Sequence, residues 1–459
     1  MNGVGNPARG LSSILRISVV AIAATVLVLA STALWIHAEL APQKAAASVL
    51  KPQLQPQQVL ASQENGDAVS AQNVAQQYMN ALLKRHYQVM WGILHPQVQA
   101  LWPGEDAFVT FWKAHFHDYT LQSFKVGRGH SLSFWVNPET MVQYDHVHEM
   151  PVSLLLTPKA TGQQLAQLPP EDQNPDLVFH NLPFVVQRVI DQTSKKATWY
   201  VLAGGPADLE APILPPVTPV NTSVQVPILM YHHISNVPPR NMLDLSLTVT
   251  PSVFNQQLAY LKAKDYHTIT FNQMFNALYY NGPLPSRPII LTIDDGYEDG
   301  YQFAYPLLRK YGFSGMFYII TGKVNWEGQM TWEQLREMLE HGMQMGSHTI
   351  HHVDMGRVLL NSGEQAQQEL QISKITLEQQ LRTVIQQFCY PSGEPFRTGS
   401  LHARQRIVIL LAQDGYVGAT TDPGMTGVLQ QSRAPFVLLR IRVDGREALQ
   451  RFIQSLPWS

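Results

Sequence analysis

The sequence predicts an α/β protein whose C-terminal (β/α) barrel follows a smaller α+β domain and an N-terminal transmembrane helix. Three observations predict this. A charge-free apolar run lies near the N-terminus, a Gln- and Pro-rich stretch and a later Pro-rich stretch interrupt the chain, and strand-like and helix-like segments alternate after residue 226. The expected parts are a cytoplasmic N-terminus, a membrane span, a linker, the α+β domain, a Pro-rich linker and the barrel, at residues 1–16, 17–36, 37–68, 69–204, 205–225 and 226–459.

The composition excludes several kinds of protein. The chain has 459 residues, of which 45% are hydrophobic and 14% charged, and its formal net charge is −2. Because the charge is low and no basic block is present, a nucleic-acid partner is not expected. The single cysteine, Cys389, excludes an intramolecular disulfide framework and a cysteine-rich zinc site. Its apolar neighbours predict a small core residue.

Residues 17–36 read ISVVAIAATVLVLASTALWI, a run long enough to span a bilayer as a helix. Arg9 and Arg16 precede it, so the positive-inside rule predicts a cytoplasmic N-terminus. We therefore expect a single-pass protein of the cell membrane with its folded domains outside the cell. The alternative is a signal peptide cleaved near residues 31–33, which would give a secreted protein.

The segment 69–204 begins with a helical pattern and continues with strand-like stretches such as SLSFWV and MPVSLLLTP. In this order and length it resembles the NTF2-like domains, in which helices pack on a curved sheet. Its function is expected to be that of a spacer or of a glycan- or partner-binding module. Four histidines form two i, i+2 pairs without a suitably placed carboxylate, so they are interpreted as surface or groove residues: His115, His117, His146 and His148.

After residue 226, strand-like runs such as PILMYH, PIILTID, MQMGSH and QQFCYP alternate with helical ones. Seven or eight such units predict a parallel sheet, which closes most economically into a barrel. In such barrels the working residues gather at the carboxyl ends of the strands. The residues at these ends are His232, Asp294, Asp295, His348, His351, His352 and the run Tyr390-Pro391-Ser392-Gly393.

Two adjacent aspartates at the end of a buried strand are costly unless a cation offsets their charge. Imidazole and carboxylate ligands together suit a borderline cation such as zinc. His348 and His352 are four residues apart and could share one ion. One aspartate could then bind the metal, while the other remains free to transfer a proton.

TIDDG and HTIHH, in this order and on strand ends, resemble the T-F-D-D-G and H-[ST]-x-x-H motifs of the NodB-type polysaccharide deacetylases, carbohydrate esterase family 4. MYHH and YPSG are similar to the branch that contains poly-N-acetylglucosamine deacetylases. Over residues 226–459 the resemblance implies Asp294 as the general base and His232 as the general acid. It implies a divalent metal, zinc with cobalt or nickel as other options, bound by Asp295, His348 and His352.

The same resemblance places the substrate and the oxyanion near Tyr390, Pro391 and Gly393, with a backbone N–H near Tyr390 as donor. The sequence departs from the family pattern in two motifs. Cys389 stands where many members have the arginine that holds the base, and VLLRIRV lacks the usual histidine. Arg440 is therefore the candidate for positioning the base. His233 and His351 are interpreted as structural.

The activity implied is that of a metal-dependent hydrolase acting on carbon–nitrogen bonds other than peptide bonds. It would remove N-acetyl groups from an extracellular polysaccharide that contains N-acetylglucosamine. Two alternatives remain open from the sequence. One is an O-acetyl esterase acting on a polysaccharide, and the other is a catalytically silent barrel that binds glycans.

Overall fold

The computed structural model describes residues 56–137, 140–159, 177–202, 213–216, 220–422 and 427–458. The segments predicted as a cytoplasmic N-terminus, 1–16, and as a membrane span, 17–36, lie outside these residues. Within the described ranges, no helix is both long enough and apolar enough to cross a bilayer.

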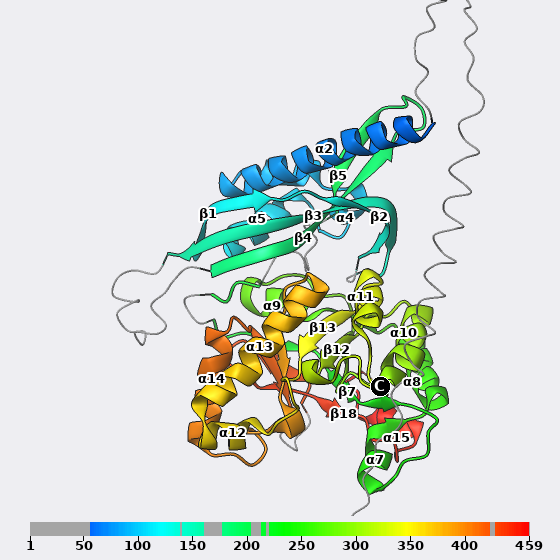
Figure 1. Cartoon of the computed structure of the whole chain (residues 1–459), viewed down its shortest axis with the longest axis vertical. Helices are drawn as coiled ribbons and strands as arrows, with labels where there is room; N and C mark the ends of the chain where they lie inside the picture. The colour runs from blue at the N-terminus through cyan, green and yellow to red at the C-terminus, as the bar shows by residue number, and fades with distance from the viewer. Residues whose placement is uncertain are drawn as a thin grey trace, which may run out of the picture. The chain divides into compact units, whose positions relative to one another are not determined.

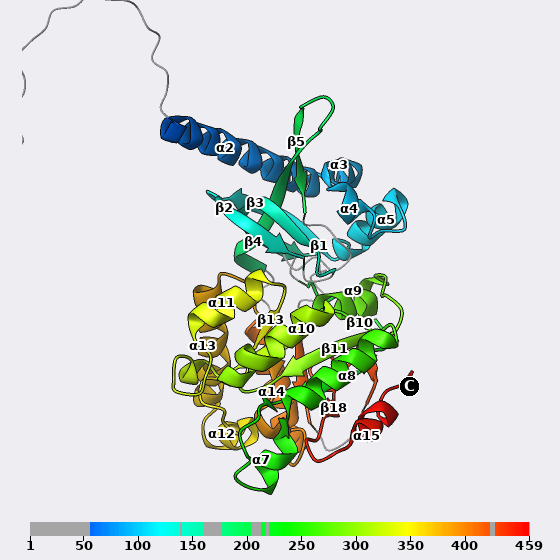
Figure 2. The ribbon, with the colours of Figure 1, turned by 90° about the vertical axis from the view of Figure 1, so that its right-hand side faces the viewer.

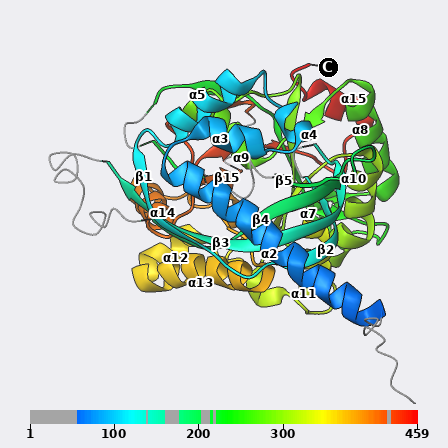
Figure 3. The ribbon, with the colours of Figure 1, turned by 90° about the horizontal axis from the view of Figure 1, so that it is seen from above.

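The first folded part combines helices with an antiparallel sheet (Figure 1). Its helices are Pro56–Leu83 (α2), Tyr87–Ile93 (α3), Pro96–Gln99 (α4) and Glu105–His115 (α5). Its strands are Tyr119–Val126 (β1), His130–Val136 (β2), Gln143–Pro158 (β3), Leu177–Ile190 (β4) and Ala197–Val201 (β5). The strand order is β1-β3-β4-β5, and β2 also pairs with β3. Helix α2 lies over this sheet (Figure 3), where the ring of Tyr78 is 5.4 Å from that of Phe184.

Two boundaries differ from those expected. Helix α2 begins at Pro56, inside the range 37–68 that the composition favours as a linker. The Pro-rich range 205–225 ends in a short strand, Ser223–Gln225 (β6), which pairs with Leu429–Gln431 (β16). Helices followed in the chain by an antiparallel sheet agree with an α+β domain. The resemblance to NTF2-like domains stays a prediction.

The second folded part is built on a parallel sheet in the order β17-β15-β14-β13-β12-β11-β7-β18, with β10 paired to β11. The strands are Ile228–Tyr231 (β7), His267–Thr268 (β10), Pro288–Ile293 (β11), Met316–Ile319 (β12), Gln344–Ser347 (β13), Gln387–Cys389 (β14), Gly418–Thr421 (β15), Leu438–Leu439 (β17) and Ile441–Arg442 (β18). The two ends of this path, β17 and β18, are separated in the chain by Arg440 alone. The sheet is therefore a nearly closed barrel, as the alternating pattern predicts.

Helices cover the barrel on its outer side (Figures 1 and 2). They are Pro251–Ala263 (α8), Phe271–Tyr280 (α9), Tyr305–Tyr311 (α10), Trp332–Glu340 (α11), Met355–Asn361 (α12), Gly363–Leu381 (α13), Leu401–Gln413 (α14) and Leu449–Gln454 (α15). The shorter elements of this part are His233–Ile234 (β8), Met242–Leu247 (α7), Thr248–Val249 (β9), Gly300–Ala304 (η2), Thr321–Lys323 (η3) and Pro391–Gly393 (η4).

Local sequence explains why these elements form where they do. Strands β7, β11, β12 and β13 are buried at every position, as expected for parallel strands covered on both faces. Thr270 and Thr331 begin α9 and α11 with reciprocal capping boxes to Gln273 and Gln334. Because all barrel strands run in one direction, their carboxyl ends meet at a single rim, where the polar residues of the sequence motifs follow them.

Candidate active site

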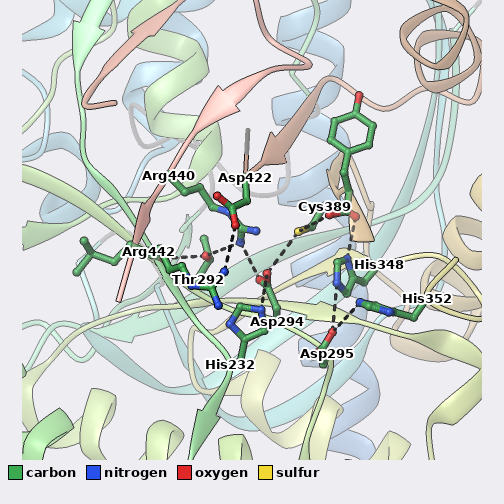
Figure 4. A network of polar contacts seen from close by, with 12 residues as sticks. His232, Thr292, Asp294, Asp295, His348, His352, Cys389, Asp422, Arg440 and Arg442 are labelled. Carbon is green, nitrogen blue, oxygen red and sulfur yellow. Dashed lines mark hydrogen bonds and ion pairs between the residues drawn. The ribbon is translucent and has the colours of Figure 1, made fainter. Parts of the chain in front are cut away.

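The strand-end residues that the sequence singles out lie together at this rim (Figure 4). His232 follows β7, Asp294 and Asp295 follow β11, and His348 follows β13. All four are buried or nearly so: the side chain of His232, the most exposed, is 16% accessible. The rim therefore combines two carboxylates and two imidazoles whose side chains are largely shielded from bulk water.

Asp295, His348 and His352 point their donor atoms at one another. Oδ1 of Asp295 lies 3.3 Å from Nε2 of His348 and 3.3 Å from Nε2 of His352. This oxygen is buried and makes no hydrogen bond of good geometry within the described chain. Burial alone would raise the pKa of Asp295, but the two imidazoles outweigh it and hold the pKa well below its usual value.

The orientation of His348 fits a metal ligand. Its Nδ1 lies 2.8 Å from the carbonyl oxygen of Cys389, which can only accept, so Nδ1 carries the hydrogen. In the neutral ring, the lone pair of Nε2 is then directed at the space shared with Asp295 and His352. An orphaned carboxylate oxygen facing two imidazole nitrogens, all within 4.8 Å of one another, suits a divalent cation.

Glu369 on α13 holds the loop that carries the second histidine. Its Oε2 accepts hydrogen bonds from the N–H groups of Ile350 (2.9 Å) and His351 (3.1 Å). Its Oε1 lies 2.7 Å from Nδ1 of His351. His351 is thus tied to a structural partner, while His352, next to it, turns into the site.

Asp294 is the second carboxylate and is 1% exposed. Its Oδ1 accepts a hydrogen bond of 2.8 Å from Nη1 of Arg440, which also donates to Oγ1 of Thr292 at 3.1 Å. Burial would raise the pKa of Asp294, but the Arg440 guanidinium, helped by His232, lowers it below its usual value. Asp294 is therefore charged at neutral pH and can accept a proton.

His232 faces the other carboxylate oxygen, with Nε2 3.8 Å from Oδ2 of Asp294. Burial lowers the pKa of His232, and the nearby Asp294 and Asp295 oppose this only in part. Its neighbour His233 has a different environment. Nδ1 of His233 lies 2.6 Å from Oδ2 of Asp299, and its ring stacks on that of Tyr297.

The run Tyr390-Pro391-Ser392-Gly393 follows β14, where a backbone donor near Tyr390 is expected. The N–H of Tyr390 is not free, because it donates to the carbonyl oxygen of Thr420 at 3.1 Å. The side chain of Tyr390 is 1% exposed and packs against Phe396. Proline has no N–H, so the next main-chain donor is Ser392, which has a φ of 55° and donates to no residue of the described chain. Within this run, the N–H of Ser392 is therefore the candidate oxyanion donor near Tyr390.

The chain is similar in sequence to known proteins. The family model "Polysaccharide deacetylase" matches residues 281–406, which include Asp294, Asp295, His348 and His352. The chain is 30% identical over 236 residues to YxkH of Bacillus subtilis (strain 168), a protein named after the polysaccharide deacetylases. This match covers 50% of the chain and 77% of YxkH. The chain belongs to the polysaccharide deacetylase family.

This polysaccharide deacetylase is also similar to other known proteins. It is 31% identical over 116 residues to the poly-beta-1,6-N-acetyl-D-glucosamine N-deacetylase of Staphylococcus aureus (strain MSSA476), which is 23% of the chain and 39% of that enzyme. Among solved structures, it is similar to the Streptococcus pyogenes deacetylase PplD in complex with acetate. The identity is 28% and the TM-score 0.44, with 52% of this chain and 99% of that chain covered.

Two contacts of the deacetylase site could not be read from its motifs. Glu369 lies on a helix after the HTIHH motif, and nothing in the sequence distinguishes it from other acidic residues on helices. Cys389 places its thiol against Asp294, although its apolar neighbours in the sequence predict only a core residue. The one available signal was the position of Cys389, at the start of the third motif, where the resemblance leads one to expect an arginine.

Arg440→Met is expected to lower the free energy of unfolding by roughly 3–5 kcal/mol, because it leaves the buried Asp294 carboxylate without its cation. Arg442→Met is the matched control. Arg442 is partly exposed and lies 3.3 Å from Asp422, so its loss is expected to cost less than about 1 kcal/mol. Urea denaturation of both variants measures the difference. Equal losses would show that the Arg440–Asp294 pair is not the stabilising contact.

Proposed function

We propose that this polysaccharide deacetylase is a metal-dependent hydrolase that removes N-acetyl groups from a polysaccharide containing N-acetylglucosamine. The observation that carries the proposal is the pairing of a charged, arginine-held carboxylate, Asp294, with the adjacent cluster of Asp295, His348 and His352. The likeness to an enzyme named for poly-beta-1,6-N-acetyl-D-glucosamine supports this substrate class.

Asp295, His348 and His352 would hold the cation, for which zinc is proposed, with cobalt and nickel as substitutes. When bound, such an ion supplies Lewis acidity, which polarises the acetyl carbonyl and makes water more acidic. The two carboxylates thus have separate tasks. Asp295 is a ligand, and Asp294, whose Oδ1 is occupied by Arg440, keeps Oδ2 for the proton.

The chain's own groups then account for the proton transfers. Asp294 accepts a proton from the attacking water, whose oxygen forms a bond to the acetyl carbon. The N–H of Ser392 donates a hydrogen bond to the oxyanion that develops. His232 gives a proton to the sugar nitrogen as the carbon–nitrogen bond breaks. The products are a free amine on the sugar and acetate.

Acetate release from a panel of polymers tests the proposal. The panel consists of β-1,6-linked N-acetylglucosamine oligomers, chitin oligomers, peptidoglycan and O-acetylated xylan, each with and without added zinc. We expect zinc-dependent release from an N-acetylglucosamine polymer. Release from acetylated xylan alone would instead indicate an O-acetyl esterase. No release from any polymer, by protein that retains its metal, would indicate a glycan-binding barrel.

His232→Ala is expected to lose far more activity on N-acetylglucosamine oligomers than on aryl acetates, because a phenolate leaves without a proton. The same role predicts a pH dependence. The acid must be protonated, so activity falls as pH rises through the pKa of His232, which burial lowers from about 6.5. The alkaline limb should therefore lie on the acidic side of that value and should disappear in His232→Ala. Equal impairment on both substrates would assign His232 to substrate positioning instead.

We further propose that residues 17–36 anchor the enzyme in the cell membrane with the barrel outside. The support is the length of the apolar run and the two arginines before it. Protease added to intact cells should digest the barrel and leave a small membrane-bound fragment. Mature protein in the medium, beginning near residue 34, would show a cleaved signal peptide and a secreted enzyme.

A further inference from the structure

The carboxylate of Asp294 has a third neighbour, the thiol of Cys389. Sγ of Cys389, at the end of β14, lies 3.6 Å from Oδ2 of Asp294, and Figure 4 shows the sulfur on the side of the carboxylate away from His232. The cysteine is 0% exposed. It reaches Asp294 across 95 positions of sequence, so the contact exists only because the barrel brings β14 and β11 together at the rim.

The thiol is placed to donate rather than to accept. A carboxylate oxygen without its own hydrogen can only accept, and the Arg440 pair keeps Asp294 in that form. A thiolate at the same place would set two negative charges against each other in a buried site. The carbonyl oxygen of Tyr390 is farther from the thiol, at 4.0 Å, and uncharged, and the side chain of His348 also lies beside the thiol. The hydrogen on sulfur is therefore best satisfied by Oδ2.

We propose that Cys389 is a positioning residue for Asp294. Arg440 holds Oδ1 from the junction of β17 and β18, and Cys389 holds Oδ2 from β14. Donors on two strands fix the rotation of the carboxylate, so that Oδ2 stays turned into the site with a lone pair left for the proton. This inference rests on the proposed function, since it concerns the residue that acts there as the base.

A spectroscopic test does not depend on turnover. The chain has a single cysteine, so its Raman S–H stretching band reports this thiol alone. A hydrogen bond to a carboxylate lowers the frequency of that band. We expect the band of the full-length protein to move to higher frequency in Asp294→Ala and to stay in place in Asp295→Ala, whose carboxylate the thiol does not contact. An unchanged band in Asp294→Ala would overturn the proposal.

The same measurement separates positioning from direct metal binding. Cys389 lies close enough to Asp294 and His348 for these three residues to form an alternative ligand set. If the thiol were a ligand, it would lose its hydrogen, and the S–H band would vanish when zinc is added. We expect the band to persist at full zinc occupancy. Its disappearance would assign Cys389 to the metal and overturn the positioning role.

Kinetics on the best substrate of the polymer panel complete the test. Cys389→Ala removes both the donor and some volume, whereas Cys389→Val removes the donor but keeps the site filled. Both should lower kcat by roughly tenfold with KM unchanged, as expected for one lost hydrogen bond to a charged group. Cys389→Ser should recover part of the lost kcat, because its hydroxyl can also donate a hydrogen bond, although the Cβ–O bond is shorter than the Cβ–S bond.

Wild-type kcat in both Cys389→Ala and Cys389→Val would overturn the proposal. So would a loss in Cys389→Ala that Cys389→Val restores, because that result would show packing alone. If the wild-type protein releases no acetate from any polymer, the proposed function fails, while the Raman shift still decides whether the thiol binds Asp294.

Discussion

Asp294→Asn is expected to lower kcat by a factor of about 10³ and to leave the metal bound, because general base catalysis contributes between 10² and 10⁴ in typical enzymes. The amide keeps an oxygen for the hydrogen bond from Arg440, which is 2.8 Å from Oδ1 in the native site. The fold should therefore survive, and only the ability to take a proton is lost. Steady-state acetate release and elemental analysis of the same preparation measure the two outcomes.

Asp295→Asn is the matched control for this variant, since it makes the same chemical change one residue further on. Oδ1 of Asp295 faces His348 and His352, so this variant should lose metal together with activity. A result in which both variants lose metal, or in which Asp294→Asn keeps most of its turnover, would contradict the division of labour between the two carboxylates.

His348→Ala is expected to abolish metal retention and activity together, because two remaining ligands do not hold a divalent cation in a site built for three. His348 is 2% exposed, so the truncation also leaves a cavity. His348→Gln retains much of the volume and should show the same loss. Zinc content after dialysis, measured beside the melting temperature, separates metal loss from unfolding.

His351→Ala is the neighbouring control. Its imidazole is 67% exposed and points to Glu369 rather than to Asp295, so the variant should retain its zinc. Full zinc occupancy in His348→Gln, or zinc loss in His351→Ala that matches the loss in His348→Ala, would show that the ligands are assigned wrongly.

Much of the site could be predicted because the motif residues are attached to strand ends. An alternating pattern predicts parallel strands, and parallel strands bring their carboxyl ends to one rim. Asp294, Asp295 and His348 each follow a buried strand directly, so their proximity follows from the barrel alone. His352 is four positions from His348, and a short turn brings it to the same place.

The partners of Asp294 could not be predicted with the same certainty. Arg440 lies 146 positions away, and it meets Asp294 because it occupies the single residue between β17 and β18, where the barrel nearly closes. Its position in the sequence made it only a candidate. The N–H of Tyr390 donates to Thr420 because β15 lies beside β14, and the sequence alone does not predict that neighbour.

The alternation of strands and helices, the order of the motifs and the chemical types of the site residues can all be predicted from the sequence, because they depend on local periodicity and on residues next to strand ends. The groups that hold the base, in contrast, depend on the folded barrel. The contacts of Asp294 with Arg440 and Cys389 join residues that are 146 and 95 positions apart in the chain. Their existence depends on strand order and barrel closure, which no local pattern encodes.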